Sequence, residues 1–189
     1  MIVPPLCARC GAPTVWPVAR CRECAGRRIA FATARAAVEY DDAVRRIVGG
    51  WKERGLRRLA ADAATLVSEA IPRPDVAALA FVPADRDRRL RRGHHPAEQL
   101  ARELARRWEL PVVQLLERVG SSRRQRGLGL VERRRNVRGA FRATRPAPPT
   151  VCLVDDVYTS GATASAAAQA LRKGGARRIE VVCFARAVR

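Results

Sequence analysis

The chain has 189 residues, of which 48% are hydrophobic, and it carries a formal net charge of +19. This length allows one sizeable hydrophobic core with room for a small appended element, and the hydrophobic share is ordinary for a globular protein. No apolar run approaches the ~18 residues that cross a bilayer, which excludes a membrane-spanning helix.

Arginine supplies nearly all of the positive charge, because Lys52 and Lys173 are the only lysines. A polyanionic partner, above all a nucleic acid, would account for such a surplus. A GC-rich coding sequence is the alternative, since it replaces lysine by arginine throughout a chain, although it does not account for the excess over Asp and Glu. The charge alone leaves both explanations open.

The first residues, 1–5, lack the basic start of a secretory signal, and cysteines follow within the next few positions. We therefore expect a cytoplasmic protein in a reducing compartment. In such a protein, paired cysteines are interpreted as metal ligands before they are interpreted as disulfides.

Two Cys-x-x-Cys pairs lie near the N-terminus, formed by Cys7 with Cys10 and by Cys21 with Cys24. Each pair can place two thiolates on one ion, so the two pairs predict a tetrahedral zinc site. The cysteines fill every ligand position, so the zinc is predicted to be structural, and it would supply the folding energy of a segment this small. A redox Cys-x-x-Cys motif and a chance pattern are the alternatives.

The pattern between residues 26 and 70 predicts a basic connector over 26–35, a strand over 36–40 and two helices over 43–53 and 56–70. Asp41 or Asp42 can cap the first helix. The predicted inward side chains are Val44, Ile47, Val48 and Trp51 in the first helix and Leu59, Ala63, Leu66 and Val67 in the second.

The middle of the chain continues with a buried strand over 77–83, an arginine-rich loop over 85–93, a helix over 96–108 and a strand over 110–116. Pro96 suits the first turn of its helix. Residues 118–138 are strongly basic and poor in apolar residues, which on composition alone indicates a solvated loop.

The C-terminal third contains the most specific pattern of the chain. An apolar strand over 151–154 leads into Asp155 and Asp156, a hydroxyl-rich turn and an alanine-rich helix over 164–173, and a last strand is predicted over 179–185. Cys152 and Cys183 lie in these apolar strands, where each is expected to be a small core residue.

A turn at a helix N-terminus offers unpaired backbone N–H groups and the positive end of the helix dipole, which suits a phosphate. Thr159, Ser160 and Thr163 add hydroxyl donors, and Gly161 lets the backbone approach the anion. The two acids would repel a simple phosphate, but they suit a ligand that carries hydroxyls beside its phosphate, as ribose 5-phosphate does. The alternative is a surface turn in which Asp156 and Thr159 cap the helix.

Residues 151–163 resemble, at every position, the 5-phosphoribosyl-1-pyrophosphate (PRPP) motif of the type I phosphoribosyltransferases. The resemblance implies that Asp155 and Asp156 face the ribose hydroxyls of PRPP, which binds with Mg²⁺. It also implies that the loop binds the 5-phosphate through Thr159, Ser160, Gly161, Ala162 and Thr163.

A second resemblance covers nearly the whole chain. The cysteine quartet, the residues Tyr40, Arg45, Arg46, Lys52 and Gly55, and Gln125, Arg133 and Asn136 before Gly139-Ala140-Phe141 resemble the ComF family, also called the GntX family. These are phosphoribosyltransferase-like proteins with an N-terminal zinc element. The resemblance implies a parallel α/β sheet flanked by helices over 31–189, a zinc element over 1–30 and a lid over 118–138.

The same resemblance implies a pyrophosphate loop with Arg88, Arg89, Arg92 and Gly93. The chain departs from the family pattern at His94-His95-Pro96, where relatives carry Phe-Asn-Gln, and at Asp85, where proline is common. A solvated helix start is the alternative interpretation of the two histidines, and the sequence around them offers no partners for a metal site.

Two functions follow from these patterns. The first is a transferase that moves phosphoribosyl from PRPP to a nitrogen acceptor, with arginines stabilising the departing pyrophosphate. The second, which the resemblance to the ComF family implies, is a non-catalytic protein that senses PRPP or a nucleotide and binds single-stranded DNA during DNA uptake, alongside a helicase-like competence protein. The 5% aromatic content offers few stacking platforms for DNA. A second copy of the chain is a further candidate partner.

Overall fold

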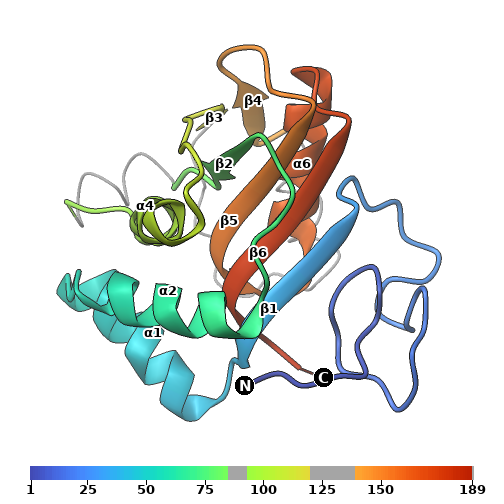
Figure 1. Cartoon of the computed structure of the whole chain (residues 1–189), viewed down its shortest axis with the longest axis vertical. Coiled ribbons are helices and arrows are strands. Elements are labelled where there is room, and N and C mark those ends of the chain that lie inside the picture. Colours follow the sequence, from blue (N-terminus) through green and yellow to red (C-terminus); the bar gives the residue numbers. More distant parts are fainter. Residues whose placement is uncertain (85–92, 120–138, 189) are drawn as a thin grey trace.

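The computed structural model describes residues 1–84, 93–119 and 139–188, and its central element is a parallel four-stranded sheet in the order β1-β6-β5-β2 (Figure 1). The strands of this sheet are β1 (Thr33–Glu39), β2 (Ala78–Phe81), β5 (Thr150–Tyr158) and β6 (Arg178–Arg186). The helices are α1 (Asp42–Arg54), α2 (Leu59–Ala70), α4 (Pro96–Trp108) and α6 (Ala162–Lys173). The prediction of a parallel α/β sheet flanked by helices is confirmed.

Strand β5 is paired on both sides and so forms the middle of the sheet. It pairs with β6 from Thr150 opposite Arg178 to Tyr158 opposite Arg186. On its other side, β2 pairs with its first half only, since the last pair is Phe81 with Val154. The second half of β5 therefore extends past the end of β2, and the edge left open there faces the candidate site.

The core lies on both faces of the sheet, because successive side chains of a strand point to opposite faces. Val151 and Leu153 of β5 pack with α6 and the N-terminal segment, whereas Cys152 and Val154 pack with α1, α2 and α4. Such burial on both faces explains the continuous apolar runs of the strands. Cys152 and Cys183 are buried in this core, as predicted.

The predicted strand over 110–116 differs from the structure. Residues 111–113 make only a short parallel bridge, between Val112 and Leu79 of β2. The chain then forms β3 (Leu116–Arg118), which pairs antiparallel with β4 (Phe141–Ala143). This small second sheet joins the two ends of a long connection, and nothing in the local pattern of three-residue strands signals it.

The ends of the helices agree with the sequence prediction better than their buried faces do. Asp41 caps α1 by accepting the backbone N–H of Val44 at 2.8 Å, and α4 spans the residues predicted from Pro96. Helix α2 begins at Leu59 rather than at residue 56. The prediction that Ile47 points inward is wrong, since it is 43% exposed.

The N-terminal segment, residues 1–32, lies beside β1 (Figure 1). The backbone N–H of Ile2 donates to Ala37 at 2.8 Å, and Ala34 donates to Arg9 at 2.9 Å. Buried side chains of this segment, among them Phe31 and Cys24, belong to the same apolar cluster as β5 and α6. The N-terminal segment therefore packs on the sheet through one shared apolar cluster.

Within the described ranges, none of the helices combines the length and the apolar character that crossing a membrane requires.

Candidate functional site

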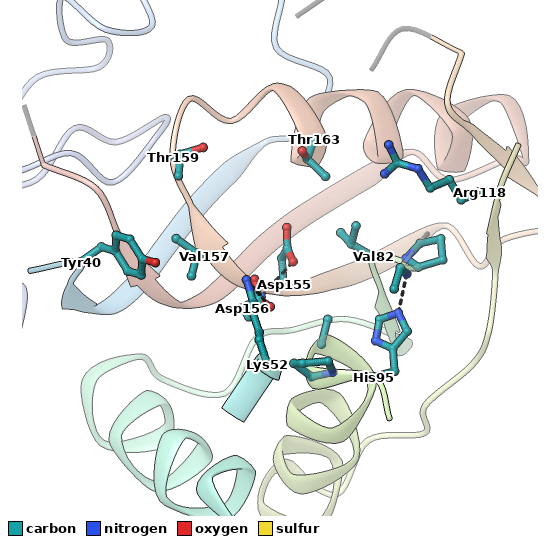
Figure 2. Close-up of a pocket in the computed structure, with 14 residues that line it drawn as sticks. Tyr40, Lys52, Val82, His95, Arg118, Asp155, Asp156, Val157, Thr159 and Thr163 are labelled. Atoms are coloured by element: carbon teal, nitrogen blue, oxygen red, sulfur yellow. Dashed lines mark hydrogen bonds and ion pairs between the residues drawn. The ribbon is translucent and has the colours of Figure 1, made fainter. Parts of the chain in front are cut away.

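A cleft of about 310 Å³ lies where β5 extends past β2. Its polar lining comes from α1, β3, β5 and the start of α6, and from single residues that directly follow β1 and β5 and directly precede α4. The polar and charged residues are Tyr40, Lys52, His95, Arg118, Asp155, Asp156, Thr159 and Thr163. Figure 2 shows the two acids between the two threonines on one side and Lys52 and His95 on the other. The structure therefore brings the acidic pair and the hydroxyl turn of the sequence motif to one cavity.

The two acids are part of β5 and do not follow it. The sequence predicted that the strand ends at Val154, but β5 continues to Tyr158. The strand is longer because Asp155 and Val157 stay paired with β6, opposite Cys183 and Ala185. The regular strand fixes the backbone of the acids, and the loop begins only at residue 159.

The phosphate-sized loop turns sharply into α6 at Gly161. This residue has φ 70° and ψ 7°, the left-handed conformation that favours glycine. A Cβ atom built on Gly161 would lie 2.2 Å from Oη of Tyr158, so the position also excludes any larger residue on packing grounds. The alternative interpretation of the motif as a helix cap is wrong, because Gly161 is the N-cap and no side chain makes the cap hydrogen bond.

The acidic pair is connected to a cation. Nζ of Lys52 lies 2.8 Å from Oδ2 of Asp156. Oδ1 of Asp155 accepts the backbone N–H of Asp156 at 2.9 Å. Burial, with the neighbouring Asp156 charge as the second cause, raises the pKa of Asp155 to about 8, while Lys52 and the Asp156 N–H oppose that rise.

This electrostatic arrangement removes the objection that two acids would repel an anion. At neutral pH the Asp155 carboxyl is mostly protonated, and the charge of Asp156 is balanced by Lys52. The three side chains together then carry almost no net charge. A phosphate can bind at the nearby loop, while the acids keep oxygen atoms available for hydroxyl groups.

Lys52 received no site role in the sequence-based assignment, which placed it only among the residues that resemble the ComF family. Its position on α1 is fixed by its neighbour Trp51, which is fully buried. Nε1 of Trp51 donates to Gln99 of α4 at 2.9 Å, and Nε2 of His94 donates to the Trp51 carbonyl at 2.7 Å. One signal could have found it, because Lys52 is one of two lysines in an arginine-rich chain.

The two histidines before α4 are buried, so the solvated helix start considered for them is wrong. His94 is 8% and His95 7% exposed. Nδ1 of His95 caps α4 by accepting the backbone N–H of Glu98 at 3.1 Å. The His95 ring also lies against Phe81, with 5.4 Å between ring centroids.

Part of the predicted site lies outside the described residues. These positions are Arg88, Arg89 and Arg92 of the pyrophosphate loop, together with Gln125, Arg133 and Asn136. Gly93 lies within the described residues and has φ 64°. Its carbonyl accepts a hydrogen bond from the Arg57 guanidinium at 3.3 Å. At the edge of the predicted lid, the guanidinium of Arg118 lies 5.3 Å from the centroid of the Phe141 ring and lines the cleft.

The four predicted zinc ligands form a second cluster. All four Sγ atoms lie within 4.8 Å of one another. The contacts are 3.6 Å between Cys7 and Cys24, 3.5 Å between Cys10 and Cys21, and 3.9 Å between Cys21 and Cys24. Four thiolates at ~2.3 Å from a zinc ion in tetrahedral geometry would be about 3.8 Å apart. The described geometry therefore fits one zinc ion.

The surroundings of the cluster favour thiolate at one position in particular. Burial would raise the pKa of Cys7, but backbone N–H groups of Cys10, Cys21 and Arg9 outweigh it and lower that pKa to about 6. One of these contacts is the Cys21 N–H, 3.2 Å from Sγ of Cys7. Such N–H contacts to sulfur stabilise the charged form that a metal binds.

No family model matches the chain. It is 29% identical, over an alignment of 195 residues, to DNA utilization protein YhgH of Salmonella typhi, with 96% of this chain and 84% of that protein covered. It is 37% identical over 111 residues to competence protein F of Haemophilus influenzae, where the match covers 56% of this chain. That match spans about half of the relative, 48% of its length. The chain is thus similar to proteins named for DNA utilization and for competence.

Among solved structures, the crystal structure of TT1426 from Thermus thermophilus matches with a TM-score of 0.38 and 20% identity. The match covers 67% of this chain and 82% of that one. The description of the fold therefore depends on the sheet order and pairing given above.

Proposed function

We propose that the chain is a ComF-family, phosphoribosyltransferase-like protein that binds PRPP in the cleft between β5, α1 and α4. The observation that carries the proposal is the convergence of Asp155, Asp156, Thr159 and Thr163 on one cavity. A ribose bearing a 5-phosphate needs oxygen acceptors for its hydroxyls beside donors for its phosphate, and this cavity offers both. The chain's similarity to proteins named for DNA utilization and competence supports the family assignment.

In this proposal the first turn of α6 receives the 5-phosphate. The hydroxyls of Thr159 and Thr163 supplement the backbone N–H groups at the positive end of a helix of 12 residues. The two carboxyl groups accept hydrogen bonds from the ribose 2- and 3-hydroxyls. Lys52 keeps the cleft nearly neutral, so that the phosphate is not repelled.

The reaction proposed for this site is transfer of the phosphoribosyl group. The bond from C1 of the ribose to the pyrophosphate oxygen breaks, and a bond from C1 to a nitrogen nucleophile forms, with pyrophosphate leaving. Arg88, Arg89 and Arg92 are proposed to stabilise that leaving group, and Mg²⁺ is proposed to bind with PRPP and neutralise its charge. The four cysteines are proposed to hold a structural zinc ion in an element spanning residues 1–30.

A second candidate function is a non-catalytic, cytoplasmic protein of DNA uptake that binds single-stranded DNA beside a helicase-like competence protein. The relatives' names and the net charge of +19 favour it. Electrostatic DNA binding should lose orders of magnitude in affinity as salt rises. Neutralising several arginines between residues 123 and 135, which lie outside the described residues, should flatten that dependence. An absence of binding at low salt would exclude this function.

The test of PRPP binding compares two ligands by calorimetric titration, with wild type and the variant Asp155→Asn with Asp156→Asn. Removing acids from a generic anion site strengthens binding, because repulsion is removed. In a ribose site the same change removes two carboxyl acceptors of the ribose hydroxyls, of which the charged Asp156 is worth roughly 1.5–3 kcal/mol per hydrogen bond. We expect the variant to bind PRPP more weakly and inorganic phosphate no more weakly. A variant that binds both ligands more tightly would overturn the proposal.

A screen of nucleobases for pyrophosphate release, with labelled PRPP, then separates the transferase from the sensor. Consumption of PRPP with one acceptor identifies both the reaction and its substrate. Binding of PRPP without consumption across all acceptors favours the non-catalytic function.

A further inference from the structure

Arg186, the last residue of β6, connects the four-cysteine cluster to the sheet. Its side chain is charged, yet the residue is only 1% exposed. Its guanidinium donates to the Cys10 carbonyl at 2.7 Å and forms an ion pair with Oε2 of Glu23 at 2.6 Å. Cys10 belongs to the first cysteine pair, and Glu23 lies inside the second. One buried cation therefore contacts both halves of the cluster.

The same guanidinium also contacts the residue that directly precedes the phosphate loop. Its Cζ lies 4.6 Å from the centroid of the Tyr158 ring. Tyr158 is the last residue of β5, is 4% exposed, and places its hydroxyl against Gly161 so closely that a Cβ there would overlap it. The loop conformation at Gly161 thus depends on where the Tyr158 ring lies, and the ring is stacked on Arg186.

Arg27 makes a second and more direct connection. This half-buried side chain follows the last cysteine by three positions. One of its nitrogens donates to the Glu23 carbonyl at 3.0 Å, and the other donates to the Ser160 carbonyl at 2.7 Å. It therefore joins the backbone of the second cysteine pair to the backbone of the phosphate loop.

We propose that the four-cysteine element sets the conformation of the phosphate loop, and that Arg27 and Arg186 are the positioning residues that couple metal binding at the cysteines to ligand binding at residues 159–163. Because a metal ion would hold both cysteine pairs together, it would fix Glu23 and Cys10, and through them the two arginines. The part of this inference that concerns PRPP rests on the proposed function.

Coupling between two sites is reciprocal, so the first test measures the metal rather than the reaction. Zinc affinity is determined by competition with a chelator, with and without saturating PRPP. We expect PRPP to raise the zinc affinity of wild type about tenfold. Arg28→Ala removes the same charge from the next residue, which is exposed, and should keep this increase, whereas Arg27→Ala should lose most of it. An increase below twofold in wild type that binds PRPP overturns the inference.

The second test does not depend on PRPP. Hydrogen exchange of the backbone amides of residues 159–163 is compared between zinc-loaded Arg27→Ala and zinc-loaded Arg28→Ala. We expect these amides to exchange about tenfold faster in Arg27→Ala, whereas the exchange of the amides in the four-stranded sheet should be the same in both variants. Equal exchange in the two variants overturns the coupling. If calorimetry shows that wild type does not bind PRPP, the proposed function fails and this second test alone decides the inference.

Discussion

The cysteine cluster and the acidic pair are both gatherings of ionisable side chains, but one is closed and the other open. The four Sγ atoms face one another within 4.8 Å, which leaves no ligand position for a substrate. Asp155 and Asp156 line a cleft, and the one ion pair found for them among the described residues joins Asp156 to Lys52. The difference is one of access: the cysteine side chains face only one another, whereas the acidic side chains face a cavity that can receive a ligand.

The largest expected effect comes from opening the closed site. Cys7→Ser with Cys24→Ser removes two of the four ligands, so zinc should be lost and the N-terminal element should unfold. We expect the protein to lose at least ~3 kcal/mol of stability, or roughly 6–12 °C in melting temperature. Elemental analysis and thermal unfolding measure both quantities. A folded wild type that contains no metal and has two N-terminal disulfides would contradict the prediction.

A substitution in the loop beside the acidic pair, residues 159–163, should cost nearly as much stability. Gly161→Ala places a methyl group 2.2 Å from Oη of Tyr158 at a positive φ, which we expect to cost about 2–4 kcal/mol in strain and overpacking. Gly26→Ala is a matched control, because its φ is +69° and no atom lies within 4 Å of the added Cβ. Phosphate binding should weaken in the first variant and persist in the second. Equal losses of stability in the two variants would show that the strain of the positive φ, and not the overlap with Tyr158, causes the cost of Gly161→Ala.

A smaller effect is expected from the cation of the open site. Lys52→Met leaves Asp156 without its partner and makes the cleft more negative, so PRPP and inorganic phosphate should both bind roughly tenfold more weakly, about 1.4 kcal/mol. Lys173→Met removes the same charge from the exposed end of α6. Calorimetry on the two lysine variants should therefore give different affinities, and identical affinities would remove Lys52 from the site.

The smallest effect concerns pH. The folded-state pKa of about 8 for Asp155 lies above its ordinary value of 3.8, so between these values the folded protein binds a proton that the unfolded chain has lost. Its contribution to the free energy of unfolding should therefore be full below about pH 4 and fall as the pH rises to about 8.

Denaturant unfolding at pH 5, 6 and 7.5 measures this dependence in wild type and in Asp155→Asn. The difference between the two proteins isolates the one carboxyl group from all others. Wild type should lose stability relative to the variant over this range. Parallel curves would mean that Asp155 is already ionised at pH 5.

The sequence predicted the parts of this molecule that depend on local signals. Pro96 and the cap residue Asp41 fixed helix starts, and the apolar runs of β5 and β6 fixed the two central strands. The cysteine spacing likewise predicted a cluster, because two tight turns need little else to meet. In each case neighbouring residues determine the outcome.

The sequence did not predict features that depend on packing between distant segments. The strand did not end before the acids, because pairing with β6 continues through Asp155. The neighbour of Lys52, Trp51, ties α1 to α4 through a hydrogen bond to Gln99, a contact across 48 residues of sequence that positions Lys52 beside Asp156. Ile47 fits the apolar period of α1, but no described element covers that part of the helix and it stays exposed.

Both outer edges of the four-stranded sheet are covered, and this has a consequence for assembly. Residues 2 and 9 bond the free side of β1, and residues 111–113 bond the free side of β2 around Leu79. A strand from another molecule would have to displace these segments before it could extend the sheet, so the fold is protected against edge-to-edge aggregation. A second copy of the chain would therefore associate through helix or loop surfaces, and a continuous intermolecular sheet is not expected.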